Sequence, residues 1–586
     1  MSVTSIFDAL TKNDLPRSLQ IFTPELLLCG TIVALLLVRL VGQERKVLPA
    51  WVALLGSLIG FVAVFTQFMY VVQVGPDVGG PIGTLYNWFH LTPNGVGEIG
   101  TPYFTGLLIH DQFGLFFRLG LSLFLVLVIA LTILTGIPDN EDGPDFYTLL
   151  IGSAVGMLLA AAANHLLMVF VAVEMMSVPS YAMVGFLKGK RQSSEAALKY
   201  VVYGAGAAGV MLYGISLLAG LFGTGDLSQL GERFTFLMEG ETFGLKSPTS
   251  VTVVLGVMMV MSGLAFKLSL VPFHFWAPDA FEGAAPEVGG YLSVASKAAA
   301  FALLVRFGLA FTGNSAVTRE LCLFLGLGLG VVASLSMTLG NLAAYTQTNL
   351  KRLLAYSTIA HAGYMVLAVS SLLVINSAVA GTAGYDRLAK YTVTFGGGGD
   401  VVANASARAL EGLMYYLAVY LFMNLAAFAI VALIRNETYR EDIDAYNGLF
   451  YANPATKVLC ICLALSFFSL VGLPPLGGFF AKMMIFFSTF GAGYVHWLMW
   501  VILGIAGLNT AFSLFYYLRV IKAMFFAAPA EDRRPVRTPG LVGAYVALVT
   551  LPVLMLGMPL LPIKPLMLQE SLSSTAFRVA ASLFGG

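Results

Sequence analysis

Charge is scarce in this chain. Asp, Glu, Lys and Arg make up 11% of its 586 residues and hydrophobic residues make up 58%, whereas a soluble domain has about 25% charged and 45–50% apolar residues. The formal net charge of +1 gives no basis for nucleic-acid binding. The composition therefore excludes an ordinary soluble protein and favours an integral membrane protein.

Cysteine is also rare, and its placement excludes two kinds of site. Cys29, Cys322, Cys460 and Cys462 lie in apolar segments, without paired C-x-x-C spacing and without companion histidines. Iron–sulfur and zinc sites need such groups of ligands. We predict neither a disulfide framework nor a metal cluster, so that any redox chemistry must occur elsewhere.

A cleavable signal peptide is lacking as well. Residues 1–20 are polar, with Lys12, Asp14 and Arg17, and they lack a short apolar core followed by a small-residue cleavage site. We therefore expect the chain to keep its N-terminus.

Long apolar runs, in contrast, recur along almost the whole chain. Each is about 20 residues long, the length with which a helix spans a bilayer core of roughly 30 Å. Short polar connectors separate them. We predict an all-α polytopic membrane protein with about fourteen transmembrane helices, at 22–41, 49–72, 113–136, 146–164, 166–186, 197–222, 251–274, 290–312, 320–342, 352–375, 409–434, 457–489, 497–522 and 540–562.

Successive connectors lie on alternate sides of the membrane, and the basic residues fall mainly in every second connector, that is, in connectors of one parity. The positive-inside rule assigns these connectors to the cytoplasm. The other parity holds the 73–112 connector, which has no Lys or Arg, the 490–496 turn, and the longer mixed-charge loops 223–250 and 376–408. Both termini are then expected outside. The cytoplasmic set contains Arg45, Lys46, Lys188, Lys190, Arg191, Lys351, Arg352, Arg435, Arg440, Arg519, Lys522, Arg533, Arg534 and Arg537.

Two apolar segments contain prolines near mid-membrane. Pro272 lies in 251–274, and Pro474 and Pro475 lie in 457–489. Because proline removes a backbone donor, and freed backbone groups are tolerated in a membrane only beside protein or water, paired broken helices indicate a cavity or an ion path.

The two breaks share the residues Ser-Leu-Val and lie five segments apart. An odd-numbered repeat has inverted topology, a frequent transporter design, although chance similarity in an apolar chain remains an alternative. We predict helices 1–3 with an outer loop in 1–145, five-helix repeats at 146–312 and 320–522, and a last helix with a tail in 540–586.

A few ionisable residues lie inside the predicted helices. Each charge at the bilayer centre costs roughly 2.5–3.5 kcal/mol on insertion scales, so such residues must pair, be hydrated or be partly neutral. Burial disfavours the charged form of Lys or Glu and a nearby opposite charge favours it, so a lysine whose partner comes and goes can load and release a proton. We predict a proton pathway that contains Glu174, Lys267, Lys297 and Lys482 near mid-segment and His361 and Lys199 nearer one end.

Each of these residues also has a structural interpretation. Glu174 could be a simple ion-pair partner of Lys267, which precedes the first break. Lys297, among small neighbours that leave room for water, and Lys482, after the second break, could extend to the membrane surface. His361 has hydroxyl-bearing residues at i−4, i−3 and i+3 on its own helix face, so a hydrogen-bonded structural histidine is nearly as well supported as a proton carrier.

Two further polar groups are ambiguous. Near the first break, a set of residues could line a route by which protons enter or could be solvated loop charges: Lys199, His274, Asp279, Glu282 and Glu287. Aromatic and arginine residues commonly anchor a helix at the membrane interface. We favour such anchoring for the residues that close segment 497–522, namely Tyr516, Tyr517 and Arg519.

Four motifs carry a resemblance to a known family. They are SEAALKY at 194–200, FKLSLVPFHFW at 266–276 with Pro278-Asp279, QTNLKRLL at 347–354, and YYLRV at 516–520. From about residue 145 to 525 the chain resembles the antiporter-like membrane subunits of proton-pumping NADH:quinone oxidoreductase, respiratory complex I, and most closely the subunit N (subunit 2) group. The first 110 residues match weakly, and loops 73–112 and 376–408 are longer than a minimal member needs.

The resemblance implies a fold and a set of roles. It implies fourteen helices, with two inverted five-helix repeats around a chain of buried charges and water. Glu174 and Lys267 would form the coupling pair, with Lys297 as the central relay. Lys482 would be the residue of the second half-channel, and His361 would lie between Lys297 and Lys482. Lys199 resembles a lysine of the family that modulates proton transfer.

The resemblance also implies that this chain holds no redox cofactor. NADH, FMN, iron–sulfur clusters and quinone would belong to other subunits, whose electron transfer would drive its protons. The expected partners are a sister antiporter-like subunit and small membrane subunits, in a bacterial inner membrane or alternatively an organellar energy-transducing membrane. The alternatives for function are a subunit of a multisubunit cation/proton antiporter, a related redox pump that does not use NADH, and a non-transport assembly subunit.

Overall fold

The computed structural model describes residues 14–42, 48–74, 99–137, 142–187, 189–244, 246–394, 400–528, 540–557 and 568–584. The chain divides into two compact units. Unit 1 consists of Met1–Met183, Gly204–Leu264 and Ala298–Phe311, and unit 2 of Val184–Tyr203, Ala265–Lys297 and Thr312–Gly586. Part of the 73–112 connector and six of the basic residues used to predict orientation lie outside the described residues: Arg45, Lys46, Lys188, Arg533, Arg534 and Arg537. The orientation therefore stays a prediction.

Fourteen helices in the described part of the chain are long and apolar enough to cross a membrane, which confirms the predicted fold class. One of them, Pro286–Leu309, is composed of α13 (Pro286–Tyr291), the π-helical turn η4 (Leu292–Ser296) and α14 (Lys297–Leu309). The others are α3 (Thr23–Leu40), α4 (Leu48–Phe68), α6 (Gln112–Thr135), α7 (Gly143–Ala162), α8 (Leu166–Val184), α9 (Arg191–Phe222), α11 (Pro248–Leu268), α15 (Ala316–Ala344), α16 (Leu350–Asn376), α18 (Val401–Thr438), α19 (Pro454–Val471), α20 (Gly477–Val495) and α21 (Leu498–Phe526).

The number agrees with the prediction, but one of the predicted segments was wrong. The segment 457–489 is two helices, α19 and α20, because Gly472 turns left-handed (φ +88°) and two prolines without backbone N–H groups follow. The last segment, predicted at 540–562, contains the shorter α22 (Gly540–Met555), and residues 558–562 lie outside the described residues.

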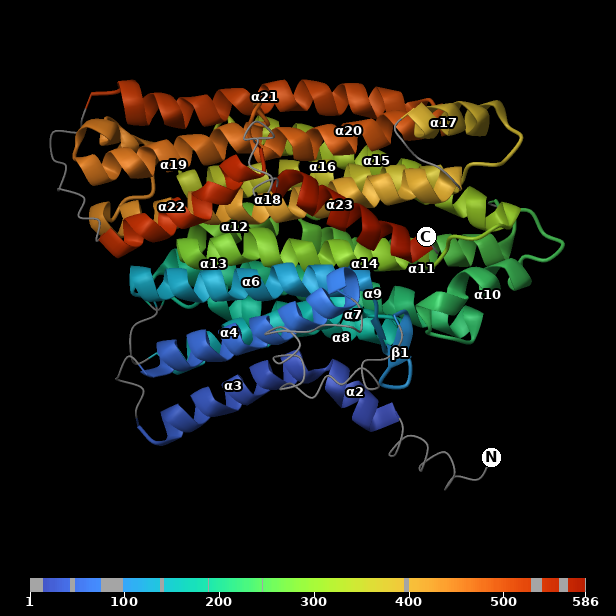
Figure 1. Cartoon of the computed structure of the whole chain (residues 1–586), viewed down its shortest axis with the longest axis horizontal. Coiled ribbons are helices and arrows are strands. Elements are labelled where there is room, and N and C mark those ends of the chain that lie inside the picture. Colours follow the sequence, from blue (N-terminus) through green and yellow to red (C-terminus); the bar gives the residue numbers. More distant parts are fainter. Residues whose placement is uncertain are drawn as a thin grey trace. The chain divides into compact units, whose positions relative to one another are not determined.

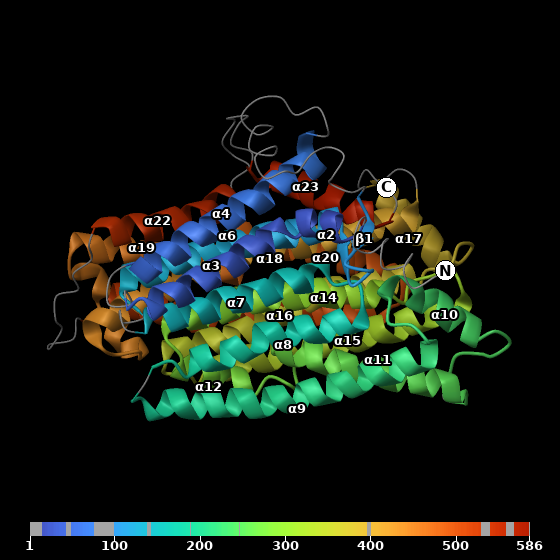
Figure 2. The ribbon, with the colours of Figure 1, turned by 90° about the horizontal axis from the view of Figure 1, so that it is seen from below.

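Unit 1 contains a small hairpin that the sequence did not indicate. Strands β1 (Thr101–Tyr103) and β2 (Leu108–His110) pair antiparallel, and Asp111 then caps α6 by accepting a hydrogen bond from Gly114 N at 2.7 Å. Figure 2 shows α3, α4, α6 and α7 running alongside one another. The short elements of unit 1 are α2 (Leu15–Ile21), η2 (Met69–Val74), η3 (Leu227–Gln229) and α10 (Leu230–Leu237).

Helix α16 is the core of unit 2. Its membrane-length window is entirely buried, as expected of a helix that is apolar all round. It packs against α15, α18 and α20, which lie beside it with similar axis directions in Figure 1. The remaining elements of unit 2 are α12 (Trp276–Gly283), α17 (Ala383–Thr394), α23 (Leu568–Ala581), η5 (Ile443–Tyr446), η6 (Leu449–Tyr451) and η8 (Ser582–Phe584).

Both predicted helix breaks are present. Helix α11 ends at Leu268, and Ser269 adopts a left-handed conformation (φ +57°) before α12 begins at Trp276. Helix α19 ends at Val471, and Gly472 follows it with a φ of +88°, a backbone angle that favours glycine; a Cβ there would lie 3.0 Å from Lys482 Cδ. The two inverted five-helix repeats themselves, and the domain boundaries, stay predictions.

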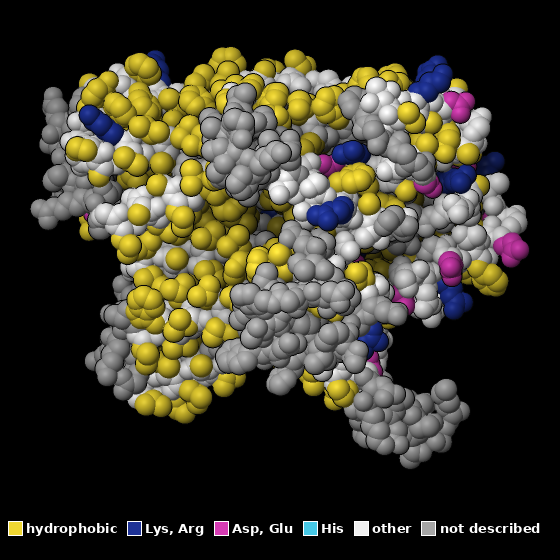
Figure 3. All heavy atoms as spheres, in the orientation of Figure 1, with side chains coloured by type: hydrophobic (Ala, Val, Ile, Leu, Met, Phe, Trp, Pro, Cys, Tyr) yellow, Lys and Arg dark blue, Asp and Glu magenta, His cyan; other side chains and the backbone are white. Residues whose placement is uncertain are grey.

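Hydrophobic side chains cover the outward faces of several helices in Figure 3. Exposed hydrophobic side chains of the described residues include Leu36 of α3, Ile59 of α4 and Leu508 of α21, which are 48%, 47% and 62% exposed. Contiguous exposed apolar surface of this kind is typical of helices that face lipid.

Candidate functional site

Lys297 is the first residue of α14 and directly follows the π-helical turn η4. Its ammonium group Nζ donates a hydrogen bond to the carbonyl oxygen of Thr358 on α16 at 2.8 Å, and the residue is 1% exposed. Among the described residues no carboxylate lies within 4.0 Å of this Nζ. π-helical turns occur frequently at functional sites. The depth of burial does not fit a lysine that extends to the surface.

His361 lies on α16, one turn beyond Thr358. Its Nδ1 lies 2.6 Å from the hydroxyl of Tyr416 on α18, and its Nε2 lies 3.4 Å from the hydroxyl of Tyr517 on α21. Hydroxyls do surround the ring, but they come from other helices. The hydroxyls on the histidine's own helix face bond elsewhere: Thr358 donates to Ala355 O and Ser357 bonds to the Tyr517 hydroxyl. Whether His361 is a structural histidine or a proton carrier stays a prediction.

The prediction of an interfacial anchor was wrong for Tyr516 and Tyr517. Both are buried, and Tyr517 contacts His361 while Tyr516 donates to Asn341 Oδ1 at 3.1 Å. Arg519 does lie near the end of α21, where it donates to Tyr345 O at 2.7 Å and to Gln347 O. These carbonyls follow the end of α15, so the arginine stabilises a helix terminus.

Lys482 lies on α20, just after the second break. Its Nζ donates to the carbonyl oxygens of Leu470 at 3.1 Å and Val471 at 2.9 Å, and it lies 4.5 Å from the ring centre of Tyr364. These are the last carbonyls of α19, which have no helical partners and carry the negative end of the helix dipole. The break therefore creates the acceptors that hold a buried cation.

Lys267 lies in the last turn of α11, next to the first break, and is 2% exposed. Its Nζ lies 5.4 Å and 5.3 Å from the ring centres of Tyr200 and Phe266, within cation–π range. Trp276 completes this aromatic group by stacking on Tyr200 at 4.1 Å. Glu174 lies on α8 in unit 1 and Lys267 in unit 2, and their predicted pairing stays a prediction.

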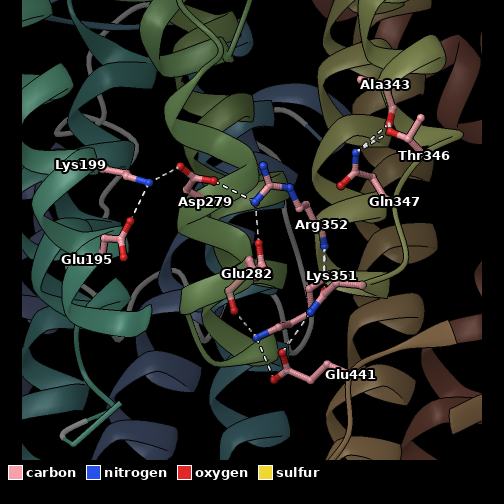
Figure 4. Close-up of polar contacts among 11 residues, drawn as sticks. Glu195, Lys199, Asp279, Glu282, Ala343, Thr346, Gln347, Lys351, Arg352 and Glu441 are labelled. Carbon is pink, nitrogen blue, oxygen red and sulfur yellow. Dashed lines mark hydrogen bonds and ion pairs between the residues drawn. The ribbon is translucent and has the colours of Figure 1, made fainter. Parts of the chain in front are cut away.

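Lys199 belongs to a network of alternating charges (Figure 4). Its Nζ lies 2.9 Å from Glu195 and 2.8 Å from Asp279. Arg352 of α16 then bridges Asp279 at 2.9 Å and Glu282 at 2.6 Å. The side chains in this network are about one-quarter to one-half exposed, so it reaches the surface of unit 2.

The residues after the first break therefore divide into two kinds. Asp279 and Glu282 belong to the partly exposed network, whereas Glu287 at the start of α13 is buried and cannot be a solvated loop charge. His274 lies outside the membrane-length helices, and burial lowers its pKa.

Lys351 lies next to the network but is almost completely buried. Its Nζ donates to the carbonyl oxygens of Glu282 at 2.7 Å and Ala284 at 2.8 Å and to the carboxylate of Glu441 at 2.9 Å (Figure 4). It thus fixes the connector between α12 and α13 to the start of α16. Partial burial and the nearby Arg435 lower the pKa of Lys190, which lies beside the same group outside the membrane-length helices, and Glu441 opposes this effect.

We expect Lys351→Met to destabilise unit 2 by about 3 kcal/mol, because it leaves a partly buried carboxylate and two carbonyls without their donor. The temperature at which the detergent-purified protein complex loses this subunit on a native gel measures the effect. Lys457→Met, at an exposed position of α19, is the matched control and should stay within about 0.5 kcal/mol of wild type. Equal stability of the two variants would contradict a clamping role for Lys351.

Several buried charges were missed from the sequence. In unit 1, Arg118 pairs with Glu25 at 2.7 Å, and Arg306 pairs with Asp111 at 2.8 Å. In unit 2, Glu411 pairs with Arg408 at 2.9 Å and accepts a hydrogen bond from Ser573. Glu25, Arg118, Arg306 and Glu411 all stand within predicted helices, so a complete count of charges inside those segments could have found them.

The described residues contain no group of three or more His, Cys, Asp or Glu side chains that could hold a metal ion. All four cysteines are free thiols. The side chains described above contribute ammonium, imidazole and phenol groups, which can hold and exchange protons.

Membrane-length helices, two helix breaks and buried lysines at or near those breaks define a polytopic membrane protein of the antiporter-like class. A family model described as NADH:quinone oxidoreductase/Mrp antiporter, TM, matches residues 163–390 and 400–510. The chain belongs to this family. It is a multi-pass protein of the bacterial inner membrane.

Two relatives and one solved structure are notably similar. NADH-quinone oxidoreductase subunit N of an Anaeromyxobacter species is 39% identical over 449 residues, which are 74% of this chain and 78% of the relative. NADH-quinone oxidoreductase subunit N 2 of Chloroherpeton thalassium is 34% identical over 512 residues, 86% and 85% of the two chains. A chain of respiratory complex I from Thermus thermophilus with bound aureothin has a TM-score of 0.65 and 27% identity, and the match covers 94% of this chain and 98% of that one.

Proposed function

We propose that this chain is a proton-translocating membrane subunit of an NADH:quinone oxidoreductase. The family and the similarity to relatives with the subunit N name support the assignment. Electron transfer to quinone would take place in other subunits and would drive protons through this one. Its redox cofactors, NADH, FMN, iron–sulfur clusters and quinone, would likewise belong to those subunits.

The observation that carries this proposal is the pair of ammonium groups of Lys297 and Lys482. Each is buried in unit 2 and is held by backbone carbonyls, and among the described residues neither has a carboxylate within 4.0 Å. Carbonyl dipoles stabilise a cation less than a permanent counter-charge does, so each amine can exist with or without its proton. A structural lysine would instead have a fixed ion-pair partner.

The proposed pathway follows the order Lys267, Lys297, His361 and Lys482. Thr358 of α16 accepts the hydrogen bond from Lys297, and His361 lies one turn further along the same helix. Tyr364, one turn beyond His361, lies under the Lys482 ammonium. Helix α16 thus brings the two lysines to either side of one histidine.

The two ends of the pathway are assigned different roles. Glu174 would supply the changing counter-charge for Lys267. Lys199, with carboxylates on both sides, would modulate the approach of protons from the surface network. A sister antiporter-like subunit and small membrane subunits are the proposed neighbours in the complex.

Lys267→Ala in the intact complex tests this function. We expect normal assembly and a large decrease in NADH-driven proton uptake by inverted membrane vesicles, because the first amine of the pathway is missing. Lys522→Ala, at an exposed position near the end of α21, should leave proton uptake unchanged. A Lys267→Ala complex that assembles and pumps like wild type would contradict the assignment, and sodium-dependent transport by this chain alone would favour a cation/proton antiporter instead.

A further inference from the structure

A cavity of about 300 Å³ lies within unit 2, where α17, α18 and α20 meet. Helix α17 packs against the other two helices (Figure 1). Residues four apart on one helix share a face, and such pairs line the cavity: Asn404 and Arg408 of α18, and Met483 and Phe487 of α20. Small-molecule sites measure roughly 300–1,000 Å³, so this volume suits a single slender ligand.

The cavity begins where membrane-length helices end. Its lining includes Ile375, the last residue but one of α16, and Asn404, in the first turn of α18. Helix α17 lies between these two ends in the chain, and its 12 residues are too few to cross a bilayer. Along α20 the lining runs from Gly491 back to Met483, roughly 12 Å at 1.5 Å per residue. The cavity therefore extends from the headgroup layer into the hydrocarbon layer.

The lining of the cavity is amphipathic. Its apolar side chains come from three helices and include Ile375, Leu388, Met483, Met484 and Phe487. Methionine side chains are flexible and adapt to irregular apolar ligands. The polar side chains are concentrated on one helix, α18, which contributes Asn404, Arg408 and Glu411. A ligand with an apolar chain and a polar end matches this division.

Arg408 has hydrogen-bonding capacity that the protein does not use. Its Nη1 donates to the carboxylate of Glu411 at 2.9 Å, and its Cζ lies 4.3 Å from the ring centre of Phe577 on α23. Among the described residues, its Nε and Nη2 have no hydrogen-bond partner, and its side chain is 46% exposed. A guanidinium group presents a planar fork of N–H donors that matches a phosphate group.

The position of Arg408 in the chain agrees with a phosphate ligand. The residue directly precedes the apolar segment 409–434, at the edge of the bilayer core, where lipid phosphates lie. Glu411 is buried, accepts a hydrogen bond from Ser573 and offsets the charge of Arg408. The site therefore recognises the phosphate group itself, and the ligand need not carry a net negative charge.

We propose that this cavity binds one acyl chain of a phospholipid and that Arg408 binds the phosphate diester of the same molecule. The second chain stays in the surrounding bilayer, which supplies the ligand. The site goes beyond the proposed function, because none of the lining residues belongs to the proposed proton pathway.

Photo-crosslinking of lipid to the intact complex tests the cavity. Phosphatidylglycerol and phosphatidylethanolamine, each with a photoreactive group at the end of one chain, are reconstituted with the complex. We expect both to label the peptides of α17 and α20 that line the cavity. Ala405→Phe, which places a ring into the cavity from α18, should lower this labelling about ten-fold. Labelling at the exposed Leu508 of α21 should stay unchanged and is the internal control.

A double variant, Arg408→Gln with Glu411→Gln, tests the phosphate contact. It removes both charges together, so no unpaired carboxylate stays buried. We expect labelling of the cavity by phospholipid to fall about ten-fold, and labelling by a diacylglycerol with the same chain to stay as in wild type. Arg387→Gln, at an exposed position of α17 outside the cavity lining, is the matched control and should label like wild type.

Three results would overturn the proposal. Labelling of the cavity that Ala405→Phe leaves unchanged would show that the chain lies elsewhere. Equal labelling of the wild-type cavity by phospholipid and diacylglycerol would show that the phosphate is not recognised. A structure of the intact complex in which a neighbouring subunit fills the cavity would exclude lipid, whereas we expect elongated density between α17 and α20 that ends at Arg408.

Discussion

Lys297→Ala is expected to abolish the contribution of this subunit to proton pumping while the complex still assembles. The variant removes an amine that is buried and held by a single backbone carbonyl at 2.8 Å. Proton transfer through a positioned group is typically 10²–10⁴-fold faster than without it. The alanine occupies less space and leaves no buried charge, so the fold should survive. Proton uptake per NADH oxidised, in inverted vesicles, measures the effect.

Lys297→Arg separates loss of the charge from loss of the exchangeable proton. Arginine keeps a positive charge at this position but does not release its proton at physiological pH. We expect the arginine variant to pump as poorly as the alanine variant. Normal pumping by Lys297→Ala would remove Lys297 from the pathway, and recovery by arginine would show that the charge alone is needed.

Lys482→Met is expected to have the second-largest effect. Methionine fills a similar volume but cannot donate to the carbonyl oxygens of Leu470 and Val471 or carry a proton. We expect a large loss of proton uptake together with lower heat stability, because these carbonyls at the end of α19 lose their donor. Proton uptake and thermal unfolding of the purified complex are measured side by side.

Lys390→Met is the control for this substitution, because Lys390 lies at an exposed position on α17. It should change neither property. If Lys482→Met lowered heat stability alone and pumped at the wild-type rate, Lys482 would be a structural cap of the broken helix and not a proton carrier.

Most of the fold could be predicted because an apolar run long enough to cross a bilayer predicts a transmembrane helix by its length and composition alone. The errors have local causes. Segment 457–489 was long enough to be one helix, and the left-handed Gly472 that ends α19 could not be distinguished from other glycines in the sequence. The hairpin from Thr101 to His110 has only three residues in each strand, too few for an alternating pattern to be recognised.

The candidate site was predictable as a list of residues but not as an arrangement. Lysines inside apolar segments stand out by their insertion cost, which is why Lys267, Lys297 and Lys482 were found. The tyrosines around His361 come from α18 and α21, far away in the sequence, and nothing local marks them as partners. Lys351 was assigned to a cytoplasmic connector because the predicted helix begins only at residue 352, whereas α16 begins at Leu350 and the Lys351 side chain is buried by the connector between α12 and α13.

The most direct test of the central claim, that Lys297 and Lys482 belong to one pathway, is a double-mutant comparison. The number of protons taken up per NADH oxidised is measured for Lys297→Ala, Lys482→Ala and the combined variant in inverted vesicles. Residues that act in series show non-additive losses, so the account predicts that the double variant pumps no worse than either single variant. Losses that add, with each single variant keeping half of the subunit's contribution, would contradict it.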